Sequence, residues 1–186
     1  SDILKKFIFI KNAKSLAIND TASLSDMDIL YMQKTIELSC LQTLNIANNY
    51  MGDESIRKLT EAMKFNTTIK SLDLSFNKIT HKGGCYIAEM LSKNNTLSKI
   101  VLSGNNIVGY GIQTLIKVLL DDNKTLIHLD LSLNGLKHED ILYISNMITK
   151  NNHIQILNLS NNHFEFKSAN ILGMSLKENR NIKKLF

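Results

Sequence analysis

The string HLDLS contains three residues that could do chemistry, His128, Asp130 and Ser132, at every second position. In an extended strand, side chains two residues apart point to the same face, so His128 and Asp130 would lie side by side. With Ser103 and Ser132 nearby, this pair suggests a nucleophile and its base. Hydrolysis also needs an oxyanion site and a pocket that excludes water, which an open strand surface lacks. The pattern therefore does not favour an enzyme.

The other residues that could bind a cofactor are scattered. The histidines in the second half of the chain form neither a His-Glu-x-x-His motif nor a pair with a cysteine. They are His128, His138, His153 and His163. The stretch GYG over 109–111 lacks the Gly-Lys-Ser/Thr sequence that would grip a nucleotide phosphate. We therefore expect no metal, no cofactor and no small-molecule ligand.

Composition indicates an ordinary soluble globular chain. It has 186 residues, of which 44% are hydrophobic and 21% charged, and this length suits one domain. No apolar run is long enough to span a membrane, and the distance between Cys40 and Cys85 favours free thiols in a reducing, cytoplasmic setting. The formal charge of +5 comes almost wholly from scattered lysines, whereas nucleic-acid-binding surfaces usually cluster arginine. We expect neither a membrane nor a nucleic acid as partner.

One unit repeats along the chain. Each clear copy alternates apolar and polar residues like a strand and then reaches an asparagine. The five clear copies are LQTLNIANNYM from Leu41, IKSLDLSFNKI from Ile69, LSKIVLSGNNI from Leu97, LIHLDLSLNGL from Leu126 and IQILNLSNNHF from Ile154. Their starts lie 28, 28, 29 and 28 residues apart, so the unit from Leu97 has one extra residue. We expect that residue to form a bulge at a helix end, near Asp121 and Asp122.

Between these strings, apolar residues return at helical spacing, as in Ile56, Leu59 and Met63. Each unit is therefore predicted to be a short strand followed by a helix. One strand and one helix cannot bury their apolar faces alone, so the units must stack on one another. The predicted fold is an α/β solenoid with a curved parallel sheet on its concave side and helices on its convex side.

The pattern Leu-x-x-Leu-x-Leu-x-x-Asn-x-Leu, with a helical half, resembles the leucine-rich repeats of the ribonuclease-inhibitor type. The resemblance covers residues 13–186 and implies one horseshoe-shaped leucine-rich repeat domain over 1–186. Residues 1–12 would form a half repeat or an N-terminal cap. Full repeats would start near residues 13, 41, 69, 97, 126 and 154, and a partial repeat would start at residue 182. Because Leu185 and Phe186 begin a strand without a following helix, we expect the natural chain to continue. The family's asparagine ladder, a structural feature that satisfies backbone groups at the turns, falls on Asn49, Asn77, Asn105, Asn134 and Asn162.

Equivalent strand positions form columns across such a sheet, because neighbouring strands lie about 4.8 Å apart. In the column before the ladder asparagine, Phe76 and Leu133 replace polar residues and flank Gly104. They either form an exposed apolar centre with a charged rim, as protein-binding surfaces do, or fold back against neighbouring loops. The predicted partner-binding residues are Phe76, Val101, Leu133 and Ile156 at the centre, Asp73, Lys99, His128 and Asp130 around them, and Tyr50, His81, Tyr110 and His138 in the loops after the strands.

We therefore expect a non-enzymatic module that binds a folded protein in its concave face. The resemblance implies more, because such horseshoes often inhibit enzymes by covering their active sites; the partner would then be an enzyme that is inhibited or regulated. The alternative from another class is a GTPase-activating protein, which also occurs among horseshoes of this repeat type. A composition rich in lysine, asparagine and isoleucine is similar to that of effectors which intracellular bacteria deliver into a host cytosol.

Overall fold

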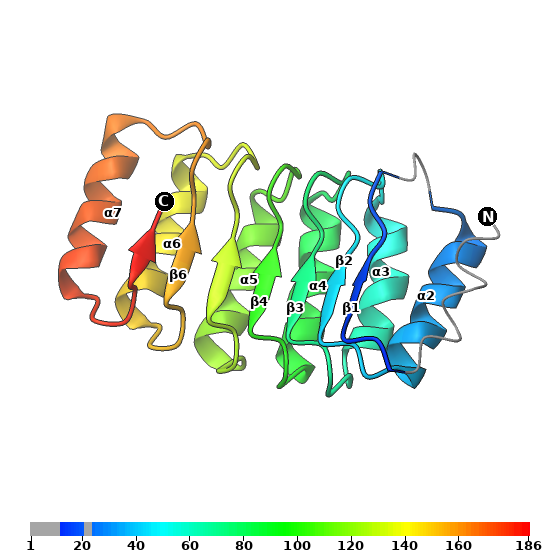
Figure 1. Cartoon of the computed structure of the whole chain (residues 1–186). Coiled ribbons are helices and arrows are strands. Elements are labelled where there is room, and N and C mark those ends of the chain that lie inside the picture. Colours follow the sequence, from blue (N-terminus) through cyan, green and yellow to red (C-terminus); the bar gives the residue numbers. More distant parts are fainter. Residues whose placement is uncertain (1–11, 21–23) are drawn as a thin grey trace.

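The computed structural model describes residues 12–20 and 24–186, in which strands and helices alternate. Except for Asn12, the expected half repeat or cap over 1–12 lies outside these residues. Figure 1 shows the strands side by side in one sheet, with all the helices packed on the same face of it. The strands are β1 (Ser15–Ala17), β2 (Thr43–Asn45), β3 (Ser71–Asp73), β4 (Lys99–Val101), β5 (His128–Asp130), β6 (Ile156–Asn158) and β7 (Lys184–Leu185). The helices are α2 (Asp26–Leu38), α3 (Asp53–Met63), α4 (His81–Lys93), α5 (Tyr110–Asp121), α6 (His138–Lys150) and α7 (Phe166–Glu178).

The sheet has the register that the repeat predicts. All seven strands pair in parallel, in the order in which they occur in the chain. The middle residues of β2 to β6, which pair with one another, are Leu44, Leu72, Ile100, Leu129 and Leu157. These side chains are buried, whereas the residues on either side of them face the open side of the sheet. The predicted α/β solenoid is confirmed.

The core runs continuously between the sheet and the helices. Ile87 and Leu91 of α4 belong to the same buried cluster as Leu72 of β3, and the pattern repeats in the neighbouring units. Full burial of one such side chain contributes about 1.5–3 kcal/mol, but only stacked units exclude water from both faces of a helix. The extra residue of the unit from Leu97 lies where we expected it, since the amides of Asp122 and Asn123 both donate to the carbonyl oxygen of Val118 at the end of α5.

Neighbouring units are also fixed to each other at the helix starts. Asp53, the first residue of α3, accepts hydrogen bonds from the backbone amides of Thr80 (2.8 Å) and Gly83 (2.9 Å) and from the Thr80 hydroxyl (2.6 Å). The next two helices approach so closely that a Cβ on Gly111 of α5 would lie 2.8 Å from the Cα and the carbonyl oxygen of His81 in α4. The helix starts are therefore held within narrow limits. In the described part of the chain, every helix is too short or too polar to cross a bilayer.

Candidate functional site

The asparagine ladder fixes the loops at the edge where the strands end. Asn134 is 2% exposed, and its Nδ2 lies within hydrogen-bond distance of the carbonyl oxygens of Leu102 (3.0 Å), Leu131 (3.2 Å) and Ser132 (2.9 Å). Its Oδ1 accepts a hydrogen bond from the amide of Ile107 (3.0 Å). Equivalent bonds to three carbonyl oxygens are made by Asn49, Asn77, Asn105 and Asn162. Each ladder asparagine thus joins its own unit to the one before it.

A second ladder, which the sequence analysis missed, fixes the opposite edge. Asn94 donates from Nδ2 to the carbonyl oxygens of Met63 (2.7 Å) and Asn66 (3.1 Å), and its Oδ1 accepts from the amides of Thr96 (2.9 Å) and Leu97 (2.8 Å). We call this set the helix-end ladder; its members are Asn66, Asn94, Asn123, Asn151 and Asn179. Their own spacing of 28, 29, 28 and 28 residues was the signal that could have found them.

The column that contains Phe76 and Leu133 has an unusual backbone. Every described member of it has a positive φ: Asp20 (59°), Asn48 (57°), Phe76 (52°), Gly104 (66°), Leu133 (54°) and Asn161 (55°). We call this set the left-handed column. Asp, Asn and Gly tolerate this conformation, whereas other residues lose about 1–2 kcal/mol in it. Hydrogen bonds between units hold it in place, since the amide of Phe76 donates to Ser103 (2.8 Å) and that of Leu133 to Ser160 (3.1 Å).

Phe76 and Leu133 are both strained and exposed. Their side chains remain 54% and 44% exposed, although their types favour burial. The Phe76 ring rests on the next loop, because a Cβ on Gly104 would lie 2.5 Å from its Cδ1 and 2.7 Å from its Cε1. Both expectations for Phe76 therefore hold in part, since one side of the ring contacts the neighbouring loop while about half of the side chain faces solvent. Strain that persists at an exposed apolar residue is typical of a functional surface.

The contact between Phe76 and Gly104 gives a testable stability difference. We expect Gly104→Ala to lower the free energy of unfolding by about 2 kcal/mol, from left-handed strain together with overlap with the ring. In a Phe76→Ala background, the same change should cost only about 1 kcal/mol, because only the strain remains. Urea unfolding of the four proteins measures this coupling. Equal costs in the two backgrounds would show that the ring does not lie on Gly104.

The two aspartates of the predicted surface also have structural roles. Asp73 Oδ1 accepts from the amide (2.9 Å) and the hydroxyl (2.7 Å) of Ser75, and closes the turn after β3. Asp130 makes the same pair of bonds to Ser132, and its Oδ2 accepts from Asn158 Nδ2 (2.8 Å). Val101 occupies the equivalent position in β4, so the concave surface changes there from a hydrogen-bonded network to an apolar side chain.

The nucleophile and base suggested by the sequence are not assembled. The Ser132 hydroxyl is buried and lies 2.6 Å from Asp130 Oδ1 and 2.8 Å from Ser103 Oγ. Among the described residues, neither serine hydroxyl is hydrogen-bonded to His128. No group of three or more histidine, cysteine or acidic side chains in that part of the chain could hold a metal ion.

His128 lies beside Lys99 in the sheet register. Burial and the charge of Lys99 lower the pKa of His128 below its usual 6.5, while Asp130 partly opposes the shift. The unfolded chain then binds a proton at higher pH than the folded chain does, so acidification favours unfolding. We expect the native protein to lose more stability than a His128→Gln variant between pH 7.5 and pH 5.5, mainly below about 6.5. Urea midpoints at the two pH values test this, and a parallel loss in both proteins would contradict it.

The remaining predicted residues lie along the edge where strands end and helices begin. Tyr50 is in a loop with φ of 55° and is 56% exposed, and Lys78 Nζ lies 4.9 Å from the centre of its ring. The prediction that His81, Tyr110 and His138 lie in loops is wrong, because they are the first residues of α4, α5 and α6. Helix formation begins earlier than the apolar pattern indicates, since the first turn needs no buried residue. His138 is also engaged, with Nδ1 lying 3.0 Å from Ser168 Oγ.

The structure thus places eight predicted residues on one surface, which we call the concave patch. Six of them lie in strands β3 to β6 on the open face of the sheet: Asp73, Lys99, Val101, His128, Asp130 and Ile156. The other two, Phe76 and Leu133, lie in the loops that directly follow β3 and β5. Its positions follow from strand register and from the ladder that fixes the loops. Its electrostatics are mixed. Two carboxylates are engaged in turns, and one lysine lies beside a histidine whose pKa is lowered by burial and by that lysine. Such a surface can bind a folded protein through apolar contacts.

Comparison with known proteins agrees with this architecture. Family models described as Leucine Rich Repeat match residues 37–59, 65–88, 122–145 and 153–174, together about half of the chain. The chain therefore belongs to the leucine-rich repeat proteins, whose fold is a protein-interaction fold. Mouse ribonuclease inhibitor is 27% identical over 123 residues, which cover 66% of this chain and 27% of the inhibitor. This similarity, together with the repeat length and the helix in each unit, makes the chain a protein of the ribonuclease-inhibitor type.

Two further similarities bear on function and fold. The Rho GTPase-activating protein gacW of Dictyostelium discoideum is 25% identical over 162 residues, which cover 83% of this chain but only 14% of gacW. A solved structure of leiomodin-1 actin-binding site 2 has a TM-score of 0.59 and 20% identity, and the match covers 95% of this chain and 89% of that one. The latter supports the fold alone. The chain spans less than a third of either curated relative, gacW or ribonuclease inhibitor.

Proposed function

We propose that this protein binds a folded partner protein in its concave patch and acts by binding, without catalysis. The observation that carries the proposal is the pair of exposed apolar residues, Phe76 and Leu133, at strained positions of the left-handed column. A polar residue at either position would suit both the backbone and the solvent better. An apolar partner surface would compensate for that cost, because burying half of such a side chain contributes about 1 kcal/mol.

The size of the sheet is compatible with stable association. Specific protein interfaces bury about 1,200–2,000 Å² in total, and a few central residues dominate their affinity. In this proposal Phe76, Val101, Leu133 and Ile156 are the anchors, and Lys99 and His128 set the orientation of the partner. Tyr50 and Tyr110 extend the contact along the edge, where both are exposed.

The finer proposal is that the partner is an enzyme whose active site the horseshoe covers. The similarity to ribonuclease inhibitor supports this proposal, but over only 27% of that protein's length. It predicts that the partner's activity on a large substrate falls in proportion to the fraction bound. An unchanged activity at saturating concentrations would favour a scaffold that holds the enzyme without covering it.

The test compares two double variants, each of which replaces one aromatic and one leucine side chain of similar exposure. In Phe76→Asn, Leu133→Asn, each position receives the residue type found at Asn48 and Asn161 of the same column, so folding should be preserved. In the control, Leu142→Asn, Tyr143→Asn, exposed apolar residues of α6 are changed on the convex side.

Affinity capture followed by mass spectrometry should recover one protein with the native chain and the control, but not with the concave variant. Binding of that purified protein should then weaken at least about a hundredfold in the concave variant, since two anchors are lost. Retention by the concave variant and loss by the control would move the binding surface to the helices and contradict the proposal.

GTPase activation is the second candidate, and the similarity to gacW favours it. It would require this chain to accelerate phosphate release from a bound nucleotide. Single-turnover GTP hydrolysis by purified Rho-family GTPases, with and without the chain, separates the two proposals. If the native chain stimulated GTP hydrolysis and the Phe76→Asn, Leu133→Asn variant did not, the chain would act as a GTPase activator through its concave patch. That result would contradict a role limited to covering an active site.

A further inference from the structure

One exposed aromatic side chain lies far from the concave patch, at the edge where the helices end. The residue directly before each asparagine of the helix-end ladder is charged in every unit but one, and so is the equivalent residue of α2. The charged residues are Glu37, Lys93, Asp122, Lys150 and Glu178. The exception is Phe65, which is 79% exposed. A solvated charge is the ordinary choice at such a position, and a phenyl ring there buries too little surface to stabilise the fold appreciably.

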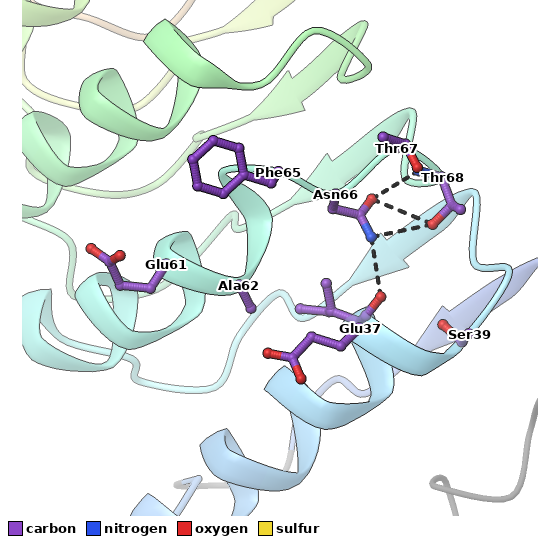
Figure 2. Close-up of a pocket in the computed structure, with 9 residues that line it drawn as sticks. Glu37, Ser39, Glu61, Ala62, Phe65, Asn66, Thr67 and Thr68 are labelled. Atoms are coloured by element: carbon purple, nitrogen blue, oxygen red, sulfur yellow. Dashed lines mark hydrogen bonds between the residues drawn. The ribbon is translucent and has the colours of Figure 1, made fainter.

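Phe65 borders a hollow of about 340 Å³ between the ends of α2 and α3. Its lining includes Ile36, Ala62 and the carboxylate-bearing Glu37 and Glu61. Figure 2 shows the Phe65 ring on one side of Ala62 and Glu37 on the other, with Glu61 next to Ala62, and it shows Asn66 of the helix-end ladder holding the adjacent backbone. The hollow is therefore a fixed depression with an aromatic side chain and two acids at its border.

The charges at this hollow favour a cation. Both helices direct their C-terminal carbonyl groups towards this edge, and their last turns contain no basic residue. The same is true of α5, whereas α4, α6 and α7 have Lys93, Lys150 and Lys177 there. The nearby Lys64 is already shared between Glu61 (2.8 Å) and Glu89 (2.7 Å). In the described part of the chain, the Glu37 carboxylate has neither an ion pair nor a hydrogen bond.

We propose that this hollow binds an arginine side chain of a partner protein. A planar guanidinium in the hollow can donate two parallel hydrogen bonds to Glu37, and the Phe65 ring, which is 79% exposed and free to turn, can then stack on it. The carbonyl ends of α2 and α3 add to the attraction. A lysine ammonium fits less well, because it is more strongly hydrated and is not planar. It therefore cannot donate two parallel hydrogen bonds to a carboxylate while stacking on an aromatic ring. The site lies on the edge opposite the loops that carry Phe76 and Leu133, so it is independent of the concave patch.

The test is a titration of the ¹⁵N-labelled chain with acetyl-Gly-Gly-Arg-Gly-Gly-amide, followed by amide chemical shifts. We expect saturable shifts confined to residues 37–39 and 61–68, with a dissociation constant on the order of 1 mM. The same peptide with citrulline, which keeps the shape but lacks the charge, should leave these amides unshifted. A lysine peptide should bind more weakly.

Three variants identify the side chains responsible. Glu37→Gln, and Phe65→Lys, which introduces the residue of this column in α4 and α6, should each weaken binding about fivefold, the equivalent of about 1 kcal/mol. Glu139→Gln removes an exposed acid from the other edge and should leave binding unchanged. Equal binding of the citrulline or lysine peptide, shifts at other acidic residues, or unaltered binding by the first two variants would overturn the proposal.

Discussion

Replacing Asn134 by alanine is expected to lower the free energy of unfolding by about 3 kcal/mol, the largest effect of a single side chain that we predict. The change leaves three carbonyl oxygens and the amide of Ile107 without the partner they have in the native protein. Each buried polar group that loses its partner costs about 1–3 kcal/mol, and water that enters the space can satisfy only some of them. Urea unfolding followed by circular dichroism measures the loss.

Asn106→Ala is the matched control, because Asn106 lies in the adjacent loop with an exposed side chain. Its stability should stay within about 0.5 kcal/mol of the native value. Asn134→Asp should cost at least as much as the alanine variant, since a carboxylate would face three carbonyl oxygens in place of an amide donor. If Asn134→Ala and Asn106→Ala unfolded at the same urea concentration, the ladder would not be what joins neighbouring units.

Gly111→Ala is expected to lower the free energy of unfolding by about 2 kcal/mol. The added methyl group would lie 2.8 Å from the Cα and the carbonyl oxygen of His81, and a backbone cannot rotate away as a flexible side chain can. The helices α4 and α5 would have to separate, which disturbs the packing of every side chain between them.

The same substitution in another helix should have the opposite sign. A Cβ on Gly173 of α7 would meet no atom within 4 Å, so Gly173→Ala should raise stability by about 0.5–1 kcal/mol through helix propensity alone. Thermal unfolding of the two variants tests both predictions. A loss of stability at Gly173, or none at Gly111, would contradict the packing described for these helices.

The two proposed binding surfaces involve residues that depart from the repeat, and the reason is physical. In a solenoid, each position is repeated because every unit meets the same neighbours, so a departure that does not improve packing needs another explanation. Phe76 and Leu133 depart in a column whose backbone suits Asp, Asn and Gly, and Phe65 departs in a column of charges. At all three positions a side chain that water disfavours remains exposed.

The repeat, the α/β solenoid and the columns of the sheet could all be predicted from the sequence. These depend on apolar periodicity, which the stacking of identical units converts directly into register: Leu72 pairs with Ile100 because each occupies the same place in its unit. The sequence also identified the amide ladder, because an asparagine that recurs at a fixed place beside buried leucines needs backbone partners.

Other features of the candidate site depend on contacts between units and could not be predicted from one unit's sequence. The positive φ of Phe76 contradicts the local preference of phenylalanine and is imposed by hydrogen bonds to a unit 28 residues away. The lowered pKa of His128 depends on Lys99 in the neighbouring strand, and the hollow beside Phe65 depends on where two helices end. Strain, charge environment and hollows arise from contacts between units, whereas local residue preferences describe one unit at a time.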